Sequence, residues 1–149
     1  MRPFYPAPIR ADFDWNRWVG VPYQTWGRGP LAYDCWGLTR SVILAGLGIR
    51  LPAFAHGYTD TGLDGDVPPL IAGHLAAGGE WFPVTLAQAR PLDILLFRVG
   101  GRVNHIGPVI QPGWFLNISR TRGSGPESYT RATWAHRIEA CYRAMGDPA

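Results

Sequence analysis

Lysine is absent from this sequence, because all fourteen Lys and Arg positions are arginine. Covalent chemistry through a lysine amine is therefore excluded. The chain has a net charge of +3 and a pI near 9.2, but its arginines are scattered and form no basic block. Nucleic-acid-binding segments usually contain such blocks, so we expect no nucleic-acid partner.

Cysteine is almost as scarce, since only Cys35 and Cys141 are present. Two cysteines cannot form a disulfide framework, so a hydrophobic core must hold the fold together. Neither the cysteines nor the four histidines have the spacing of a metal site. We therefore expect no metal and no other cofactor, and we interpret Cys141 as an inert thiol.

Long apolar runs are missing as well. Nowhere do about 18 apolar residues follow one another, and residues 1–6 lack the apolar stretch of a signal peptide. We expect a chain that starts as a soluble cytoplasmic protein and does not insert into a membrane. A substrate outside the membrane would then require delivery by a route other than the usual secretion signal.

The residues that are present are typical of one folded domain spanning residues 1–149. Hydrophobic residues make up 46% of the chain and include seven Trp, six Tyr and six Phe, whereas disordered chains are poor in aromatic residues. The 19 Gly and 14 Pro are about twice the usual share. This share predicts short elements and many loops, and it disfavours an all-helical bundle.

Hydrophobic periodicity predicts helices in the first half of the chain and short strands in the second. We expect helices within 11–19, over 35–47 and over 67–77, and strands at 80–86, 93–99, 105–111, 114–119 and 136–143. Residues 50–65 and the stretch 120–130, rich in Arg, Gly and Ser, are interpreted as loops, the second of them mobile. Helices followed by an antiparallel sheet give an α+β fold.

The pentapeptide Asp34-Cys35-Trp36-Gly37-Leu38 lies where a loop rich in Gly, Pro and Trp changes into the predicted helix over 35–47. A cysteine in the first turn of a helix faces backbone N–H groups and the positive end of the helix dipole, and both favour thiolate over thiol. Asp34 is suited to be the N-cap, and Gly46 and Gly48 mark the helix end. Taken alone, the pentapeptide fits a nucleophile and a buried structural cysteine equally well.

A thiol nucleophile needs a base, and His105 is the histidine best placed to supply it, because it opens a strand after a Gly-Gly turn. The other histidines are interpreted as surface or packing residues: His56, His74 and His136. A turn at Pro112-Gly113 follows the strand, so a hairpin would bring Asn117 back beside His105. The side-chain amide of Asn117 could then accept a hydrogen bond from the imidazole N–H.

Four segments occur in order over residues 15–120: Gly20-Val21-Pro22-Tyr23 followed by Trp26-Gly27, Asp34-Cys35-Trp36-Gly37-Leu38, Pro91-Leu92-Asp93-Ile94-Leu95-Leu96-Phe97, and His105-Ile106-Gly107 leading to Asn117. Together they resemble the NlpC/P60 family of papain-like cysteine peptidases, bacterial and phage enzymes that cut peptidoglycan stem peptides. The resemblance implies a papain-like NlpC-type α+β domain. In such a domain, the N-terminal helices, including the nucleophile helix, pack on an antiparallel β-sheet.

The resemblance also implies a role for each matching residue. Cys35 would be the nucleophile, His105 the general base and then acid, and Asn117 the third residue of a Cys-His-Asn triad. Tyr23, Trp36 and the backbone N–H of Cys35 would contact the substrate or stabilise the oxyanion. The two matching aspartates are interpreted as structural: Asp34 and Asp93.

Two departures from the common family pattern refine this expectation. Trp36 stands where many members have Ser, a variant that resembles cell-wall peptidases encoded with phage tails and gene transfer agents. Asn117 stands where many members have a second His, and an uncharged amide stabilises an imidazolium less than a carboxylate does.

The resemblance thus implies an endopeptidase of a phage-like tail that acts on peptidoglycan stem peptides. The expected bond joins D-glutamate to a diamino acid, and the expected partners include tail hub or tail-tip proteins. A chain made in the bacterial cytoplasm without a signal peptide would reach the periplasm or cell wall inside the tail particle.

Two other functions fit the same residues. The first is a structural or assembly module at a tail tip, with a closed pocket or lost chemistry, in which Trp36 and the loop over 120–131 serve docking. The second is an amidase or acyltransferase that uses the same nucleophile on another acyl group.

Overall fold

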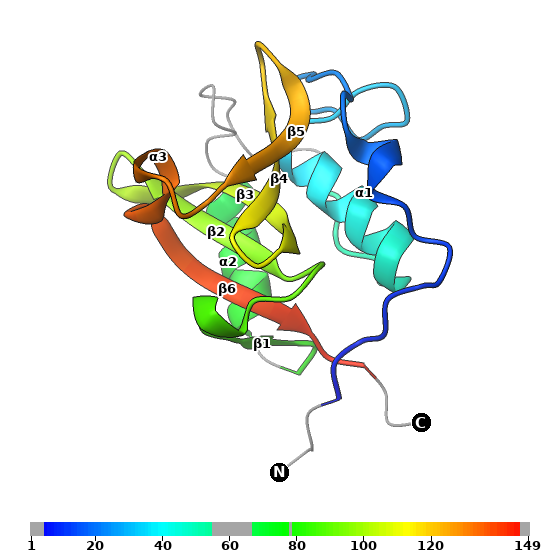
Figure 1. The fold of residues 1–149 in the computed structure, drawn as a ribbon, viewed down its shortest axis with the longest axis vertical. Coiled ribbons are helices and arrows are strands. Elements are labelled where there is room, and N and C mark those ends of the chain that lie inside the picture. Colours follow the sequence, from blue (N-terminus) through cyan, green and yellow to red (C-terminus); the bar gives the residue numbers. More distant parts are fainter. Residues whose placement is uncertain (1–4, 55–66, 78, 147–149) are drawn as a thin grey trace.

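The computed structural model contains one sheet of six antiparallel strands with helices packed on it (Figure 1). It describes residues 5–54, 67–77 and 79–146. The strand order in the sheet is β1-β6-β2-β3-β4-β5. In chain order the elements are η1 (Trp15–Trp18), α1 (Cys35–Leu47), α2 (Val67–Ala76), β1 (Trp81–Pro83), η2 (Leu86–Gln88), β2 (Ile94–Val99), β3 (Arg102–Gln111), β4 (Trp114–Ser119), β5 (Gly123–Ser128), α3 (Ala132–Ala135) and β6 (Ile138–Ala144). The predicted α+β fold is confirmed.

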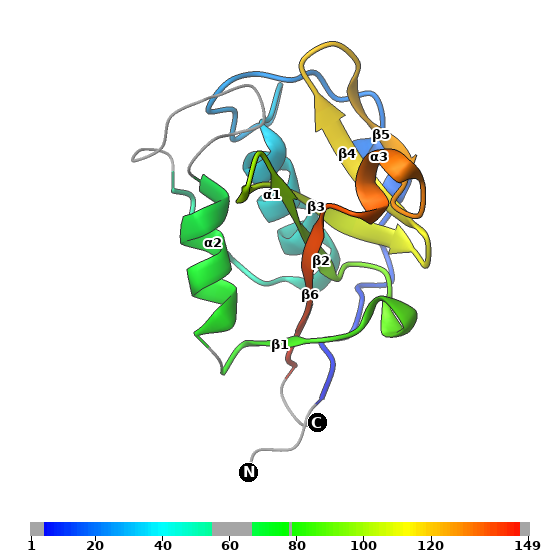
Figure 2. The same ribbon diagram turned by 90° about the vertical axis from the view of Figure 1, so that its left-hand side faces the viewer.

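The two faces of the sheet bury different clusters. Helices α1 and α2 lie on one side of the strands and α3 on the other (Figure 2). Successive residues of a strand point to opposite faces, so Ile94 and Leu96 enter the cluster beneath α1 and α2, while Leu95 and Phe97 enter a second cluster that contains Trp134. We call these the helix-side cluster and the Trp134 cluster.

Helix α1 has the boundaries that its sequence predicts. The side chain of Asp34 accepts a hydrogen bond from the Gly37 N–H at 2.7 Å, which makes it the N-cap, and Gly48 ends the helix in the left-handed conformation with φ of 71°. Gly37 permits a close backbone approach, because a Cβ there would lie 1.9 Å from the carbonyl oxygen of Gly27. The start of α1 is therefore held directly against the loop that precedes it.

The predicted hairpin between residues 105 and 119 is present as strands β3 and β4, which pair antiparallel. Strand β3 begins at Arg102, three residues before the predicted start, because it continues its pairing with β2 up to the Gly-Gly turn. A Cβ on Gly107 would lie 2.7 Å from the ring of Phe115 on β4. The glycine after His105-Ile106 thus lets the two strands of the hairpin pack closely.

The stretch 120–130 is not the mobile loop that its composition predicts. Residues Gly123–Ser128 form β5, which pairs with β4 from Trp114 to Ser119. An edge strand needs backbone pairing on one side only, so Gly, Ser and Pro are tolerated there although they give no alternating pattern. The interpretation of 120–130 as a loop is therefore wrong.

The remaining expectations are confirmed in place, with shifted bounds. The predicted helix in 11–19 is the 3₁₀ turn η1, the strand at 80–86 is shortened to β1 before η2 begins, and the strand at 136–143 is β6, preceded by the short helix α3. Residues 51–54 have no regular structure, as predicted, and 55–65 lie outside the described residues, as does His56. Within the described ranges, no helix is long and apolar enough to cross a membrane.

Candidate active site

Cys35 is the first residue of α1 and is buried, with 1% of its surface exposed. N–H groups in the first turn of a helix have no acceptor within the helix and lie at the positive end of its dipole. Two further contacts fix this turn: the hydroxyl of Thr39 donates to the Cys35 carbonyl at 2.8 Å, and Arg28 donates to Asp34 Oδ1 at 2.8 Å. The thiol thus sits at a rigid helix start, as the sequence predicts.

Tyr23 lies in the loop before α1, twelve residues ahead of Cys35 in the sequence, and packs against the same helix-side cluster as Cys35. The guanidinium of Arg120 lies over the Tyr23 ring, 5.1 Å from its centre. The loop is tied to the helix start by hydrogen bonds from Gln24 N–H to the Tyr33 carbonyl and from Asp34 N–H to the Gly27 carbonyl. The structure therefore places Tyr23 and Cys35 in one packed unit.

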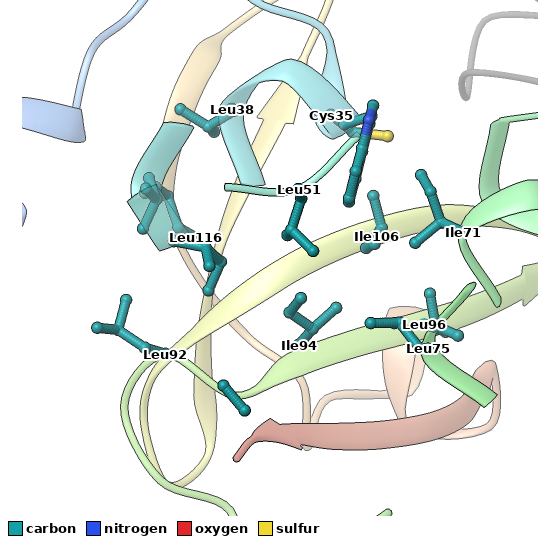
Figure 3. Close-up of a cluster of buried hydrophobic side chains, with 14 of the residues drawn as sticks. Cys35, Leu38, Leu51, Ile71, Leu75, Leu92, Ile94, Leu96, Ile106 and Leu116 are labelled. Atoms are coloured by element: carbon teal, nitrogen blue, oxygen red, sulfur yellow. The ribbon is translucent and has the colours of Figure 1, made fainter. Parts of the chain in front are cut away.

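His105 and Asn117 are brought together as the hairpin predicts. His105 Nε2 and Asn117 Oδ1 are 2.6 Å apart, and both residues are buried. An amide oxygen can only accept, so Nε2 carries the proton of this hydrogen bond and Nδ1 is the nitrogen that can gain or lose a proton. Helix α1 packs against β3, and Ile106 of β3 shares the helix-side cluster with Cys35 (Figure 3). The ring of His105 itself lies against Phe97 and Trp134 of the Trp134 cluster.

Two further residues complete the surroundings of His105, and the sequence did not point to either. Asn117 Nδ2 donates a short hydrogen bond to Glu127 Oε2, and Trp134 Nε1 donates to Glu127 Oε1 at 3.1 Å. The indole of Trp134 stacks on the His105 ring, with centres 5.2 Å apart and an angle of 18° between the planes. Glu127 falls in the stretch interpreted as a loop, so no signal of strand pairing was available to place it opposite Asn117.

Strand β5 connects the two parts of this site. Its residue Ser124 is buried and accepts the Val21 N–H on its hydroxyl at 2.8 Å, while its own N–H donates to the Val21 carbonyl at 2.9 Å. Three residues further on, Glu127 holds Asn117. A single edge strand thus anchors the loop that carries Tyr23 and the hairpin that carries His105.

Trp36 is in the hydrophobic core rather than on a substrate surface. Its side chain is completely buried, its indole N–H donates to the Pro52 carbonyl at 2.9 Å, and its ring packs near that of Phe54. The expected substrate contact of the Trp36 side chain therefore has no exposed surface to act through. Its indole fixes the chain that follows α1 against the start of the helix.

A cavity of about 300 Å³ opens beside His105. Its lining runs from β3 to α3 and is polar or aromatic except for one isoleucine: His105, Asn117, Ile118, Ser119, Thr121, Arg122, Glu127 and Trp134. Of these, Glu127 is the acidic side chain and Arg122 the basic one. In residues 5–54, 67–77 and 79–146, no three His, Cys, Asp or Glu side chains are grouped so that they could hold a metal ion.

The other residues singled out by the sequence lie apart from this cavity. Asp93 is buried and accepts two hydrogen bonds from the guanidinium of Arg143, at 3.0 Å on Oδ1 and 2.9 Å on Oδ2. The sulfur of Cys141 lies 4.0 Å from Asp93 Oδ2. Burial, followed by the charge of Asp93, raises the pKa of Cys141 to about 12, and Arg143 offsets part of this. His74 lies on α2, and His136 is exposed just after α3.

A family model described as NlpC/P60 family matches residues 20–143, which include both parts of this site. Among solved structures, the chain is similar to an NLP/P60 family protein from Staphylococcus aureus, with a TM-score of 0.67 and 17% identity over 99% of this chain and 46% of that one. It is also similar to an NlpC/P60 family protein from Bacillus cereus, with a TM-score of 0.66 and 19% identity over 94% of this chain and 42% of that one.

The peptidoglycan hydrolase RipB from Mycobacterium tuberculosis has a TM-score of 0.53 and 20% identity over 89% of this chain and 61% of that one. The present chain spans less than half of the length of the Staphylococcus and Bacillus proteins. No curated protein matches the sequence. At these identities, the likeness to the solved structures shows the fold, which is the papain-like α+β arrangement expected from the motifs.

Proposed function

The chain belongs to the NlpC/P60 family, and on that premise we propose that it is a cysteine peptidase that hydrolyses an amide bond in the stem peptide of peptidoglycan. The observation that carries the proposal is the 2.6 Å contact of His105 Nε2 with Asn117 Oδ1, on a hairpin packed against the helix that begins at Cys35. The similar fold of RipB, a peptidoglycan hydrolase, supports the choice of substrate.

The proposed triad is Cys35, His105 and Asn117. Asn117 keeps the proton of the neutral imidazole on Nε2, so Nδ1 is the atom that takes the proton of the thiol. The helix start favours the resulting thiolate through its N–H groups and its dipole. The Cys35 backbone N–H and the Tyr23 hydroxyl are the proposed donors to the oxyanion.

In the first step, the sulfur of Cys35 attacks the carbonyl carbon of the amide and forms a C–S bond. The C–N bond breaks, and His105 gives the proton taken from the thiol to the leaving amine nitrogen, which leaves a thioester. A water molecule then attacks the thioester carbon and passes a proton to His105. The C–S bond breaks, the acid product leaves, and the sulfur recovers its proton from His105.

The finer parts of the proposal follow the motif variant with Trp36. We place the chain in the branch found with phage tails and gene transfer agents, with tail hub or tail-tip proteins as partners and the periplasm or cell wall as the place of action. The proposed bond joins D-glutamate to a diamino acid. Detection of the chain in purified tail particles, and its absence from particles lacking the tail tip, would test this placement.

Digestion of purified peptidoglycan by the full chain tests the hydrolase itself. Wild-type protein and Cys141→Ala are expected to release the same peptide fragments, and Cys35→Ala is expected to release none. Mass analysis of the new amine and acid ends identifies the bond, which also separates a peptidase from an amidase. Equal release by wild type and Cys35→Ala would rule out the proposed nucleophile.

A second function, a structural module at a tail tip, is favoured by one observation. Only 1% of the Cys35 surface is exposed, and Trp36 beside it is completely buried. Hydrolysis requires the helix start to open enough for a substrate carbonyl to reach the sulfur. Failure of a small reagent such as iodoacetamide to modify Cys35 in the folded protein, together with no digestion, would favour the structural module.

A further inference from the structure

The carboxylate of Glu127 lies at the end of a directed chain of hydrogen bonds that starts at His105. His105 Nε2 donates to Asn117 Oδ1, and Asn117 Nδ2 donates to Glu127 Oε2. The other carboxylate oxygen, Oε1, accepts from Trp134 Nε1. Because an ionised carboxylate can only accept and an indole N–H can only donate, these contacts leave one orientation for each group.

This chain fixes the amide of Asn117. The two ends of an Asn side chain have nearly the same shape, so an amide without a second partner could present either its oxygen or its NH₂ to the imidazole. With Glu127 holding Nδ2, the oxygen faces His105 Nε2. In the opposite orientation, the NH₂ group of Asn117 would face Nε2 of His105. It would then favour the imidazole tautomer without a proton on Nε2, which is the wrong tautomer for a triad.

Glu127 also brings a negative charge to a site whose third residue has none. Asparagine can orient an imidazole but cannot compensate the charge of an imidazolium as a carboxylate does. Glu127 and His105 line the same cavity, in which Arg122 is the other fixed charge. Trp134 covers the His105 ring on one side, so the field of the carboxylate acts partly through protein rather than through water.

We propose that Glu127 is a positioning residue that supplies, through Asn117, the orientation and the negative charge that a third-residue carboxylate would supply directly. The functional unit is then Cys35-His105-Asn117-Glu127, with Trp134 holding the far oxygen of Glu127 and one face of His105. This inference rests on the proposed hydrolase as far as catalysis is concerned. Its electrostatic part concerns His105 alone and can be measured without any substrate.

The test compares two variants that differ only in the charge. A single Glu127→Gln change would remove the charge and also leave one amide NH₂ facing a donor, because Gln has one acceptor oxygen for the two donors Asn117 and Trp134. In a Trp134→Phe background, the second donor is gone and a phenyl ring remains beside His105. Trp134→Phe and Trp134→Phe/Glu127→Gln can therefore keep the same hydrogen bond to Asn117.

The first measurement follows the His105 ring proton by NMR over pH in both variants, with Cys35→Ala added so that the thiol does not titrate with the imidazole. We expect the midpoint of His105 to fall by about 0.5 to 1 pH unit when Gln replaces Glu127. Arg122→Gln is the matched control, because loss of a positive charge from the same cavity should move the midpoint upward. Equal midpoints with and without the Glu127→Gln change, in the absence of unfolding, would overturn the proposal.

The second measurement is the pH dependence of peptidoglycan digestion by the same pair with Cys35 intact. On the alkaline side of the pH profile, activity falls as the imidazolium of His105 loses its proton. This fall should occur at lower pH in the protein with Glu127→Gln, while the melting temperature stays within a few degrees. If wild type digests and the limb does not move, the role of Glu127 is wrong and the hydrolase stands. If wild type does not digest but the NMR midpoint falls, the hydrolase is wrong and the link from Glu127 to His105 stands.

Discussion

Two regions of this protein bury a cysteine next to the same kinds of charged residue. In each, a buried aspartate forms an ion pair with an arginine that is itself mostly buried: Asp34 with Arg28 near Cys35, and Asp93 with Arg143 near Cys141. Both thiols are almost fully covered, with 1% and 3% of their surface exposed. Burial and composition therefore do not distinguish the proposed nucleophile, Cys35, from the thiol interpreted as inert, Cys141.

What distinguishes the two regions is the backbone. Cys35 opens a 13-residue helix, and the Asp34 carboxylate accepts the Gly37 N–H of that helix at 2.7 Å. Cys141 lies in the middle of strand β6, where there is no helix dipole, and the Asp93 carboxylate reaches within 4.0 Å of its sulfur. The N–H groups and dipole of the helix start favour a thiolate at Cys35, whereas burial, followed by the charge of Asp93, opposes one at Cys141.

The largest expected difference is in the reactivity of the two thiols. With a pKa of about 12, Cys141 has almost no thiolate at pH 8. The N–H groups and dipole at the start of α1 favour a thiolate at Cys35, so we expect iodoacetamide to modify Cys35 at least ~1000-fold faster. Peptide mapping by mass spectrometry measures both rates, and Cys35→Ala supplies the Cys141 rate alone. Comparable rates would remove the distinction between the two regions.

The ion pair of Asp93 should dominate stability in its own region. Replacing Arg143 with Met leaves a buried carboxylate without its arginine, which costs about 3 to 5 kcal/mol of unfolding free energy. Urea denaturation of the wild type and Arg143→Met measures this cost. Arg143 lies outside the proposed site, so digestion per folded molecule should stay unchanged, and a parallel loss of digestion in folded protein would show that the regions are coupled.

The surroundings of Cys35 in the candidate site could be predicted from the sequence because local rules determine them. The two ends of α1 are defined to within one residue by the capping Asp34 before Cys35 and by the left-handed Gly48. The side-chain contact of His105 with Asn117 was also predictable, because the turn at Pro112-Gly113 returns the second strand of the hairpin alongside the first. These features depend on residues that are close together along the chain.

The partners of Asn117 could not be predicted in the same way. Apart from Glu127, strand β5 consists of Gly, Ser and Pro without alternation, and its position depends on the backbone of β4. The contacts of Glu127 with Asn117 and Trp134 can be recognised only when the positions of this edge strand and of α3 are known. The burial of Trp36 depends in the same way on the Pro52 carbonyl, which an interpretation of the pentapeptide alone does not include.

The raised pKa of Cys141 has a consequence for stability at alkaline pH. An unfolded thiol releases its proton near its ordinary value of 9.0, whereas the folded protein holds the proton up to about 12. The contribution of the Cys141 thiol to the unfolding free energy is therefore fully present below pH 9 and is lost as the pH rises toward 12. Between pH 9 and 10.5, we expect the unfolding free energy of wild type to fall by about 1 to 2 kcal/mol more than that of Cys141→Ala, as measured by urea unfolding. Parallel curves for the two proteins would mean that the thiol is not held neutral by the fold.

The smallest expected effect isolates the capping role of Asp34. Asp34→Asn and Asp34→Ala both lose the ion pair with Arg28, but only Asn retains an oxygen that can accept the Gly37 N–H. Urea unfolding should therefore give Asp34→Ala an unfolding free energy about 1 kcal/mol lower than that of Asp34→Asn. Iodoacetamide should also modify Cys35 faster in the Asn variant than in the Ala variant, because Asn keeps the first turn of α1 in place. Equal stability and equal rates would mean that Asp34 acts at Cys35 through its charge, as Asp93 does at Cys141, and the contrast between the two regions would then lie in the helix alone.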